Sequence, residues 1–220
     1  MSDTESMLDV NIPWPKKGDI LFTDAEDWQY NACLNKFGED WYAYTEGYRR
    51  AADTLVEHIT QRCRYDVDFL VYPIVFLYRQ HLELRLKTLI IDGNRLYDNP
   101  PGFPKTHKID ILWKECRKIL EKVWPKGPKE EIDAVEICIV EFSKIDPKSE
   151  AFRYPVDRDE TPILPSELKR INVRHLADSM AKVANFLDGA HCGITEHLDI
   201  KGDIEREYRH IMADDMDCYW

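Results

Sequence analysis

Residues 66–92 read DVDFLVYPIVFLYRQHLELRLKTLIID and are apolar on nearly every side of a helix. The middle of this stretch nevertheless carries Arg79, His81, Glu83, Arg85 and Lys87. At 100° per residue, Arg79 falls near the centre of one apolar face, and Glu83 follows one turn later as an i, i+4 partner. An all-round apolar helix is typical of the centre of a bundle, where a charge has to be paired or line a site. This stretch predicts a central helix whose charges form a structural ion pair or the edge of an active site.

The composition favours one helical domain, with or without an extension. The chain has 220 residues, of which 44% are hydrophobic and 32% charged, enough for a core and a hydrated surface. Glycine contributes only 9 residues, which disfavours glycine-rich phosphate loops and tight β-hairpins. The sequence also lacks the motifs of phosphate-loop, dinucleotide-binding, zincin and α/β-hydrolase proteins. These four classes of function have no support.

Charge, hydropathy and cysteine usage limit which partners and which cellular compartment we expect for the protein. A formal net charge of −11 argues against coating nucleic acid through the overall field, but it leaves room for a local basic groove. The first 13 residues have neither the basic start nor the apolar core of a signal peptide, and the longest apolar run, residues 69–78, is too short to span a bilayer. The six scattered cysteines are typical of reduced thiols. We expect a cytoplasmic protein without a membrane segment.

Hydrophobic periodicity predicts an all-α helical bundle of about five to six helices. The expected helices cover residues 40–63, 66–92, 107–123, 129–145 and 166–188, with Gly189 as the stop of the fifth. The first helix has an apparent core stripe of Tyr44, Tyr48, Ala51, Leu55 and Ile59, and the fifth has a seam of Val173, Leu176, Met180, Val183 and Leu187. Residues 146–165 are proline-rich, which predicts an irregular insertion with a short extended β pair around Arg158–Glu160.

Three segments make up the expected domain organisation. Residues 1–38 show no sustained period but contain Trp14, Phe22, Trp28 and Tyr30, so we expect an N-terminal arm packed on the bundle. Residues 39–190 form the helical bundle itself. Residues 191–220 are polar and acidic, which indicates a last helix followed by a solvated tail.

The strongest candidate site lies at residues 170–175, Arg-Ile-Asn-Val-Arg-His, near the start of the fifth helix. Helical geometry puts Asn172 and His175 on the same side. Histidine can take and return a proton near neutral pH, and arginine can hold phosphate oxygens through two parallel hydrogen bonds. This combination suits metal-free cleavage of RNA, in which acid–base catalysis contributes about 10²- to 10⁴-fold. The alternative is a plain helix start, with Arg170 and Arg174 solvated and His175 bonded to a neighbouring helix.

The helix order, the Arg-x-x-x-x-His of Arg170 and His175, and the charged central helix together resemble the HEPN superfamily over about residues 45–190. The resemblance implies a small helical bundle that cleaves RNA without a metal, works as a dimer, and serves a defence or toxin–antitoxin system. It also implies Arg170 and His175 as the catalytic pair. The usual signature often has Asn, Asp or His directly after the arginine; here Ile171 takes that place and Asn172, expected to orient the histidine or the phosphate, comes one position later.

Four further cations are candidates for contacting phosphate: Arg79, Lys87, Arg153 and Arg174. Arg153 stands between Phe152 and Tyr154 just before a proline, so it could present a guanidinium with aromatic faces for a base to stack on. Alternatively, the two rings close the end of the bundle and Arg153 pairs with an acid. Arg79 and Lys87 would supply charge facing the fifth helix, unless Arg79 and Glu83 pair within the bundle.

Other histidines have simpler interpretations. His81 is predicted to be a core or interface residue, and His107 a residue of the capping turn that begins with Thr106. Between residues 188 and 197 lie Asp188, His191, Cys192, Glu196 and His197, but their spacing fits no familiar zinc pattern. We interpret that stretch as a solvated loop, and we expect no metal and no cofactor.

Two hypotheses about function follow from these patterns. The first is a HEPN-like homodimer that cleaves RNA, either tRNA or single-stranded RNA. The second is a non-catalytic helical sensor or adaptor that binds a protein partner or a nucleotide in the same cleft. The ribonuclease hypothesis requires Arg170 and His175 to line one cleft. A helical metalloenzyme would require the late histidines to converge on carboxylates.

Overall fold

The computed structural model describes the backbone of residues 13–34 and 41–217, and the side chains of that part as far as residue 213. Five α-helices follow one another: α1 (Trp41–Gln61), α2 (Val67–Leu96), α3 (Ile109–Val123), α4 (Lys129–Ile145) and α5 (Val173–Asp217). Two short 3-10 helices, η1 (Trp28–Tyr30) and η2 (Arg64–Asp66), complete the described elements. The all-α prediction is confirmed. Within the described ranges, no helix has both the length and the hydropathy to cross a membrane.

The chain divides into two units, Met1–Glu39 and Asp40–Trp220. The described part of the first unit contains η1 and a loop closed by Asn31, whose side chain bonds both the N–H and the C=O of Ala25. The packing of this arm on the bundle stays a prediction. All five α-helices belong to the second unit.

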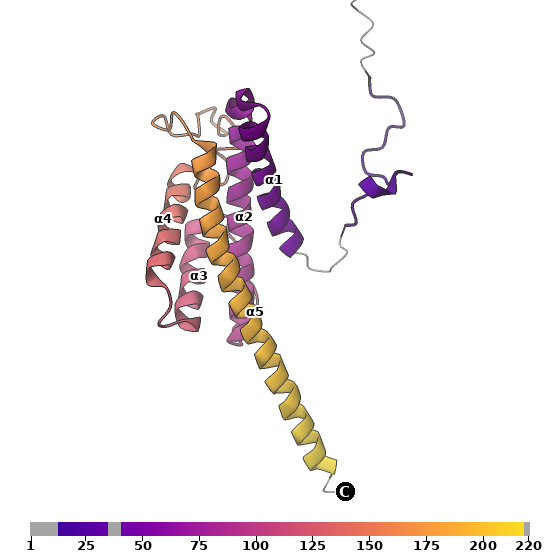
Figure 1. Ribbon diagram of the computed structural model, residues 1–220, viewed down its shortest axis with the longest axis vertical. Coiled ribbons are helices and arrows are strands. Elements are labelled where there is room, and N and C mark those ends of the chain that lie inside the picture. The colour runs from indigo at the N-terminus through magenta and orange to yellow at the C-terminus, as the bar shows by residue number, and fades with distance from the viewer. Residues whose placement is uncertain (1–12, 35–40, 218–220) are drawn as a thin grey trace, which may run out of the picture. The chain divides into compact units, whose positions relative to one another are not determined.

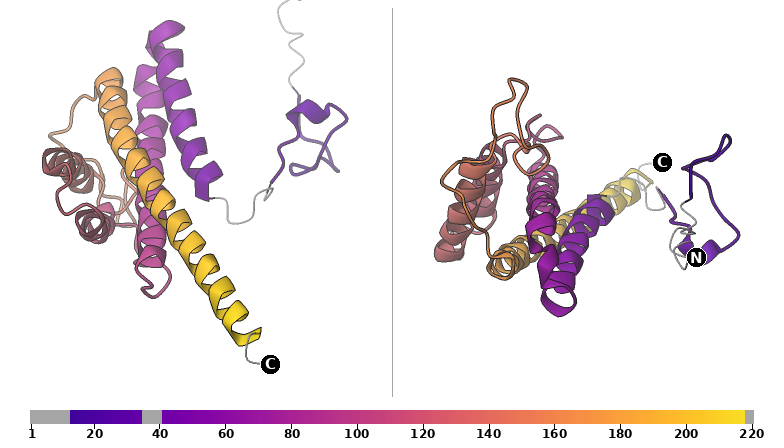
Figure 2. Two further views of the ribbon diagram at one scale, coloured as in Figure 1. Left: turned by 60° about the horizontal axis from the view of Figure 1, so that its bottom comes forward. Right: turned by 90° about the horizontal axis from the view of Figure 1, so that it is seen from above.

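Helix α2 is the central helix of the bundle, as its sequence predicts. It contacts α1, α3 and α5, while α4 packs on α3 and α5. Helix α2 lies between α1 and the pair formed by α3 and α4 in Figure 1 and in both views of Figure 2. Its buried apolar side chains include Ile74, Tyr78, Leu82, Leu86 and Leu89. Because α2 is covered on several sides by other helices, most of its apolar side chains are removed from water, which stabilises the fold.

The predicted stripe of helix α1 is only partly buried: Ile59 is buried and Leu55 packs against the core, but Tyr44 and Ala51 are exposed. The buried residues are Thr45, Ala52, Val56 and Ile59. Thr45 tolerates burial because its hydroxyl donates to the carbonyl of Trp41, and its own carbonyl bonds His81. The face therefore shifts by one residue because hydrogen bonding, and not hydropathy alone, decides what can be buried.

Helix α5 is longer than predicted and begins later. It starts at Val173, not at residue 166, and runs without interruption to Asp217, so the predicted stop at Gly189 and the separate last helix are wrong. A glycine inside a helix costs only about 1 kcal/mol relative to alanine. Buried Leu187 and Ile194 on either side offset that cost. The predicted seam is confirmed, with Val173, Met180, Val183 and Leu187 buried. The C-terminal half of α5 extends beyond the other four helices (Figures 1 and 2).

The segment between α4 and α5 is irregular, but the predicted β pair is not formed. The described chain has no strand, and pairing there is limited to one antiparallel bridge between Val156 and Pro162. Prolines on both sides remove the N–H groups that would extend the ladder. Glu160, with φ of 59°, completes the tight turn between the bridged residues.

Candidate functional site

The candidate site is a pocket of about 270 Å³ at the end of the bundle where α4 ends and α5 begins. This end is at the top of Figure 1, where α2 also begins. Most of the wall is apolar and comes from three helices and the segment before α5: Val75, Phe142, Ile145, Phe152, Leu168 and Met180. Arg170, Asn172, His175 and Glu141 line the same pocket and are exposed. The pocket thus joins an apolar interior to a polar, partly basic mouth.

Asn172 fixes the start of α5. Its side-chain oxygen accepts hydrogen bonds from the backbone N–H groups of Arg174 and His175, both at 3.1 Å, which is the geometry of an N-cap. Its carbonyl accepts the first helical bond, from Leu176. Asn172 therefore sets where the helix that carries His175 begins, and its role in orienting the imidazole or a phosphate stays a prediction.

Arg170 and His175 lie on opposite sides of this cap and line one pocket, as the ribonuclease hypothesis requires. Among the described residues, neither side chain forms an ion pair or a hydrogen bond, so His175 is not bonded to a neighbouring helix. The start of α5 also contributes the partial positive charge of a helix N-terminus. A guanidinium, an imidazole and a helix start at one apolar pocket can accept a phosphate group beside a flat apolar ligand.

The structure places Arg79 and Lys87 away from this pocket, in a buried cluster around Glu83. Arg79 is fully buried, and its guanidinium lies 3.3 Å from Glu83 Oε2 and 3.6 Å from Asp146 Oδ2. Lys87 Nζ lies 2.7 Å from Glu83 Oε1, and His107 Nδ1 lies 2.8 Å from the same oxygen. Of the two alternatives for these cations, the contacts correspond to the structural ion pair.

The Glu83 carboxylate is stabilised in its charged form. Burial raises its pKa, but hydrogen bonds from Lys87 and His107 outweigh burial and leave the pKa below its usual value. Thr106 accepts a hydrogen bond from the N–H of Lys108, but it does not cap α3, which begins at Ile109 after Lys108 and has no side-chain cap. The imidazole of His107 instead reaches Glu83 of α2. The loop before α3 is thereby anchored to the central helix.

Arg153 and Arg174 both lie near the pocket. The guanidinium of Arg153 sits 5.6 Å from the ring centre of Phe76 and 5.4 Å from that of Tyr154, and it bonds the carbonyl of Ser149. Phe152 is buried in the pocket wall while Tyr154 is exposed, so one ring closes the bundle and the other remains accessible. Arg174 is exposed and lines a neighbouring groove of about 360 Å³.

Sequence reasoning missed Arg64, which lines that second groove together with Thr60, Asn172 and Arg174. Arg64 belongs to η2, between α1 and α2. Because α1 and α2 are antiparallel neighbours, their connection had to lie at one end of the bundle. No local pattern in the sequence specifies that the start of α5 lies beside this connection. The place of Arg64 at the second groove therefore could not be predicted.

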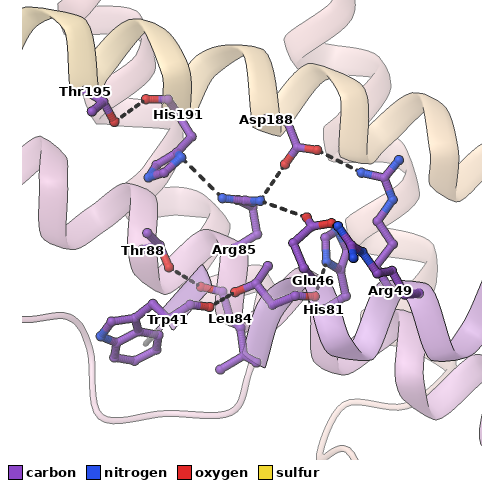
Figure 3. A network of polar contacts seen from close by, with 12 residues as sticks. Trp41, Glu46, Arg49, His81, Leu84, Arg85, Thr88, Asp188, His191 and Thr195 are labelled. Carbon is purple, nitrogen blue, oxygen red and sulfur yellow. Dashed lines mark hydrogen bonds and ion pairs between the residues drawn. The ribbon is translucent and has the colours of Figure 1, made fainter. Parts of the chain in front are cut away.

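A second buried network joins α1, α2 and α5 (Figure 3). Arg85 at its centre lies 2.7 Å from Asp188 Oδ1, 3.5 Å from Glu46 Oε1 and 3.3 Å from His191 Nδ1. Asp188 also accepts a hydrogen bond of 2.8 Å from Arg49 of α1. These contacts join the three helices through the guanidinium groups of Arg85 and Arg49 and the carboxylates of Asp188 and Glu46.

The predicted solvated loop at residues 188–197 is instead part of α5, and two of its polar residues are bound to other helices. Asp188 is bound to the two arginines, and His191 Nε2 lies 3.1 Å from Asp92 Oδ2. Across the residues with described side chains, no group of three or more His, Cys, Asp or Glu is placed to hold a metal ion.

Comparison with protein-family models, with curated proteins and with solved structures finds no match for this chain.

Proposed function

We propose that the pocket is a site of metal-independent RNA cleavage in a HEPN-like protein that acts as a homodimer in a defence or toxin–antitoxin system. The observation that supports this most is that Arg170 and His175, both exposed and without side-chain partners among the described residues, line one pocket. The six-residue motif and the helix order contribute the resemblance. The apolar wall offers space for a nucleobase, with its phosphate at the polar mouth.

The chemistry assigns one task to each side chain. His175 removes the proton from a ribose 2′-hydroxyl, the oxygen attacks the adjacent phosphorus, and the P–O5′ bond breaks. The proton returns to the 5′-oxygen, so the products are a 2′,3′-cyclic phosphate and a 5′-hydroxyl. Arg170 stabilises the charge that accumulates on the non-bridging phosphate oxygens in the transition state. Asn172 contributes by capping the helix that carries His175.

The competing function is binding of a nucleotide or a protein partner without cleavage. Glu141, which lines the same, mainly apolar pocket, favours the protein partner over any phosphate-bearing ligand, since a carboxylate there repels phosphate. Nucleotide binding and RNA cleavage would place a phosphate at the same polar mouth and differ in whether a bond is broken.

Incubation of the purified protein with tRNA and with single-stranded RNA in EDTA tests the proposal. The wild type should generate 2′,3′-cyclic phosphate ends, and His175→Ala should lower the rate by about 10²-fold or more without changing the melting temperature. His210→Ala is the matched control, because His210 is an exposed histidine of the same helix outside this pocket. Retained cleavage by His175→Ala contradicts the catalytic role, and a wild type that binds but does not cleave RNA supports the binding module.

A further inference from the structure

An unusual aromatic surface lies beside the pocket, on the first turns of α2. Phe69, Tyr72 and Phe76 follow the i, i+3, i+7 spacing of one helix face, and Tyr65 precedes them in η2. Tyr65 is 75% exposed, Phe69 76% and Tyr72 47%, whereas Phe76 is partly buried against the cluster that contains Phe152. Isolated exposed aromatics are ordinary, but several rings on one face of a helix whose remaining faces form the core indicate a binding surface.

Arginine side chains lie against these rings. The guanidinium of Arg64 is 5.4 Å from the ring centre of Tyr65. Arg153 lies within 5.6 Å of Phe76 and 5.4 Å of Tyr154, which is itself exposed. We call Tyr65, Phe69, Tyr72, Phe76 and Tyr154, with Arg64 and Arg153, the stacking surface. It combines aromatic rings with two guanidinium groups, in a protein whose formal net charge is −11.

The stacking surface borders the pocket. Val75 and Phe152, the chain neighbours of Phe76 and Arg153, line the pocket wall. Arg64 lines the second groove together with Ile171, Asn172 and Arg174, and both Ile171 and Asn172 also line the pocket. Arg64 therefore links this groove to the ring of Tyr65.

We propose that the stacking surface binds the unpaired bases of single-stranded RNA, and so selects single strands and loops over duplexes as the ligand of the pocket. The inference rests on the proposed function for the identification of RNA. Base–aromatic stacking requires free base faces, which a duplex hides, and the guanidinium groups of Arg64 and Arg153 beside the rings can bind the phosphates of the same strand. A protein partner fits this surface less well, because it would have to desolvate two guanidinium groups that have no acidic partner in the described part of the chain.

Fluorescence anisotropy on the His175→Ala background measures binding without cleavage. The probes are a labelled unstructured 12-nucleotide single strand and a blunt duplex of the same sequence, in EDTA at two salt concentrations. We expect tighter binding of the single strand. Phe69→Ala and Tyr72→Ala should each raise its Kd about 5- to 100-fold, the range for loss of one stacked base. Tyr208→Ala, which removes an exposed ring from the far half of α5, is the matched control and should leave the Kd unchanged.

Leucine and tryptophan variants separate stacking from simple apolar contact. Phe69→Trp should retain the affinity, while Phe69→Leu should lose most of it despite its apolar side chain. Full affinity in Phe69→Leu would contradict stacking, and so would the absence of any loss in the alanine variants. Preference for the duplex, or absence of single-strand binding by the parent protein, would also contradict it.

Two further outcomes distinguish this inference from the proposed function. If Phe69→Ala and Tyr72→Ala cleave RNA as fast as the wild type when made in the wild-type protein, and bind single strands as tightly as the parent when made in His175→Ala, the stacking surface is refuted and the ribonuclease stands. If single strands bind as expected but the wild type cleaves nothing, the ribonuclease is refuted and the stacking surface stands. Dissociation of a wild-type dimer by Phe69→Ala and Tyr72→Ala, with RNA affinity intact, would show that the rings form a contact between copies and overturn the inference.

Discussion

The buried charges around Glu83 and the exposed charges at the pocket are made of the same residue types, but they have opposite surroundings. Arg79 and Lys87 are taken out of water and bound to one carboxylate. Arg170, Arg174 and His175 are exposed and, in the described structure, have no acidic partner. The difference shows that the type of residue and its place on a helix do not reveal a ligand site. What matters is whether an opposite charge from elsewhere in the fold already holds the cation.

Of the substitutions that test this comparison, removal of the carboxylate of the buried cluster should change the free energy of unfolding most. Glu83→Ala leaves Arg79, Lys87 and His107 without their shared acceptor, so we expect the free energy of unfolding to fall by about 3–5 kcal/mol in urea titrations. Glu130→Ala, at an exposed position in the first turn of α4, is the control and should change it by less than about 0.5 kcal/mol. A cost below about 1 kcal/mol for Glu83→Ala would mean that the cluster is not a structural element.

Local patterns predicted the parts of the fold that depend on neighbouring residues. The limits of α4 and the end of α3 agree with the predicted helices, and the Arg79–Glu83 pair is present as expected from its i, i+4 spacing. The contact between Lys87 and Glu83 follows the same i, i+4 spacing and could have been predicted from the sequence. His107 was not, because it approaches Glu83 from a loop 24 residues away in sequence.

Features that depend on distant segments were missed. The continuity of α5 through Gly189 rests on packing and on Asp188 and His191, which are bound to residues of α1 and α2 more than 90 positions earlier. These contacts with α1 and α2 stabilise the helical conformation of α5 at the position where its own sequence predicts an end. The pocket mouth was predicted from one motif, whereas Arg64 became visible only when two helix ends were placed together.

A smaller effect should appear in the pH dependence of stability, through the buried His81 of α2. His81 is fully buried, with Nδ1 bonded to the carbonyl of Thr45; burial lowers its pKa below the usual value. The unfolded chain therefore binds the proton more readily, so stability is fully present above about pH 6.5 and falls as the pH drops toward the lowered pKa. Urea titrations at several pH values should show a slope of up to about 1.4 kcal/mol per pH unit in this window, reduced in His81→Gln. An unchanged slope in the variant would exclude His81 as its source.

The smallest expected effect on stability is that of replacing an exposed arginine at the pocket. The same substitution also tests the proposed function. Arg170→Met should change the free energy of unfolding by less than about 0.5 kcal/mol, because a solvated guanidinium without an acidic partner loses little when it is replaced. Arg79→Met, at the buried cluster, is the matched substitution and should cost several times more, since it leaves Glu83 and Asp146 short of a positive charge. The same two proteins should reverse their order in RNA binding and cleavage: Arg170→Met weakens both, whereas folded Arg79→Met retains both. If Arg170→Met proves as destabilising as Arg79→Met, then Arg170 has a structural partner after all, and the distinction between paired and available cations fails at the pocket itself.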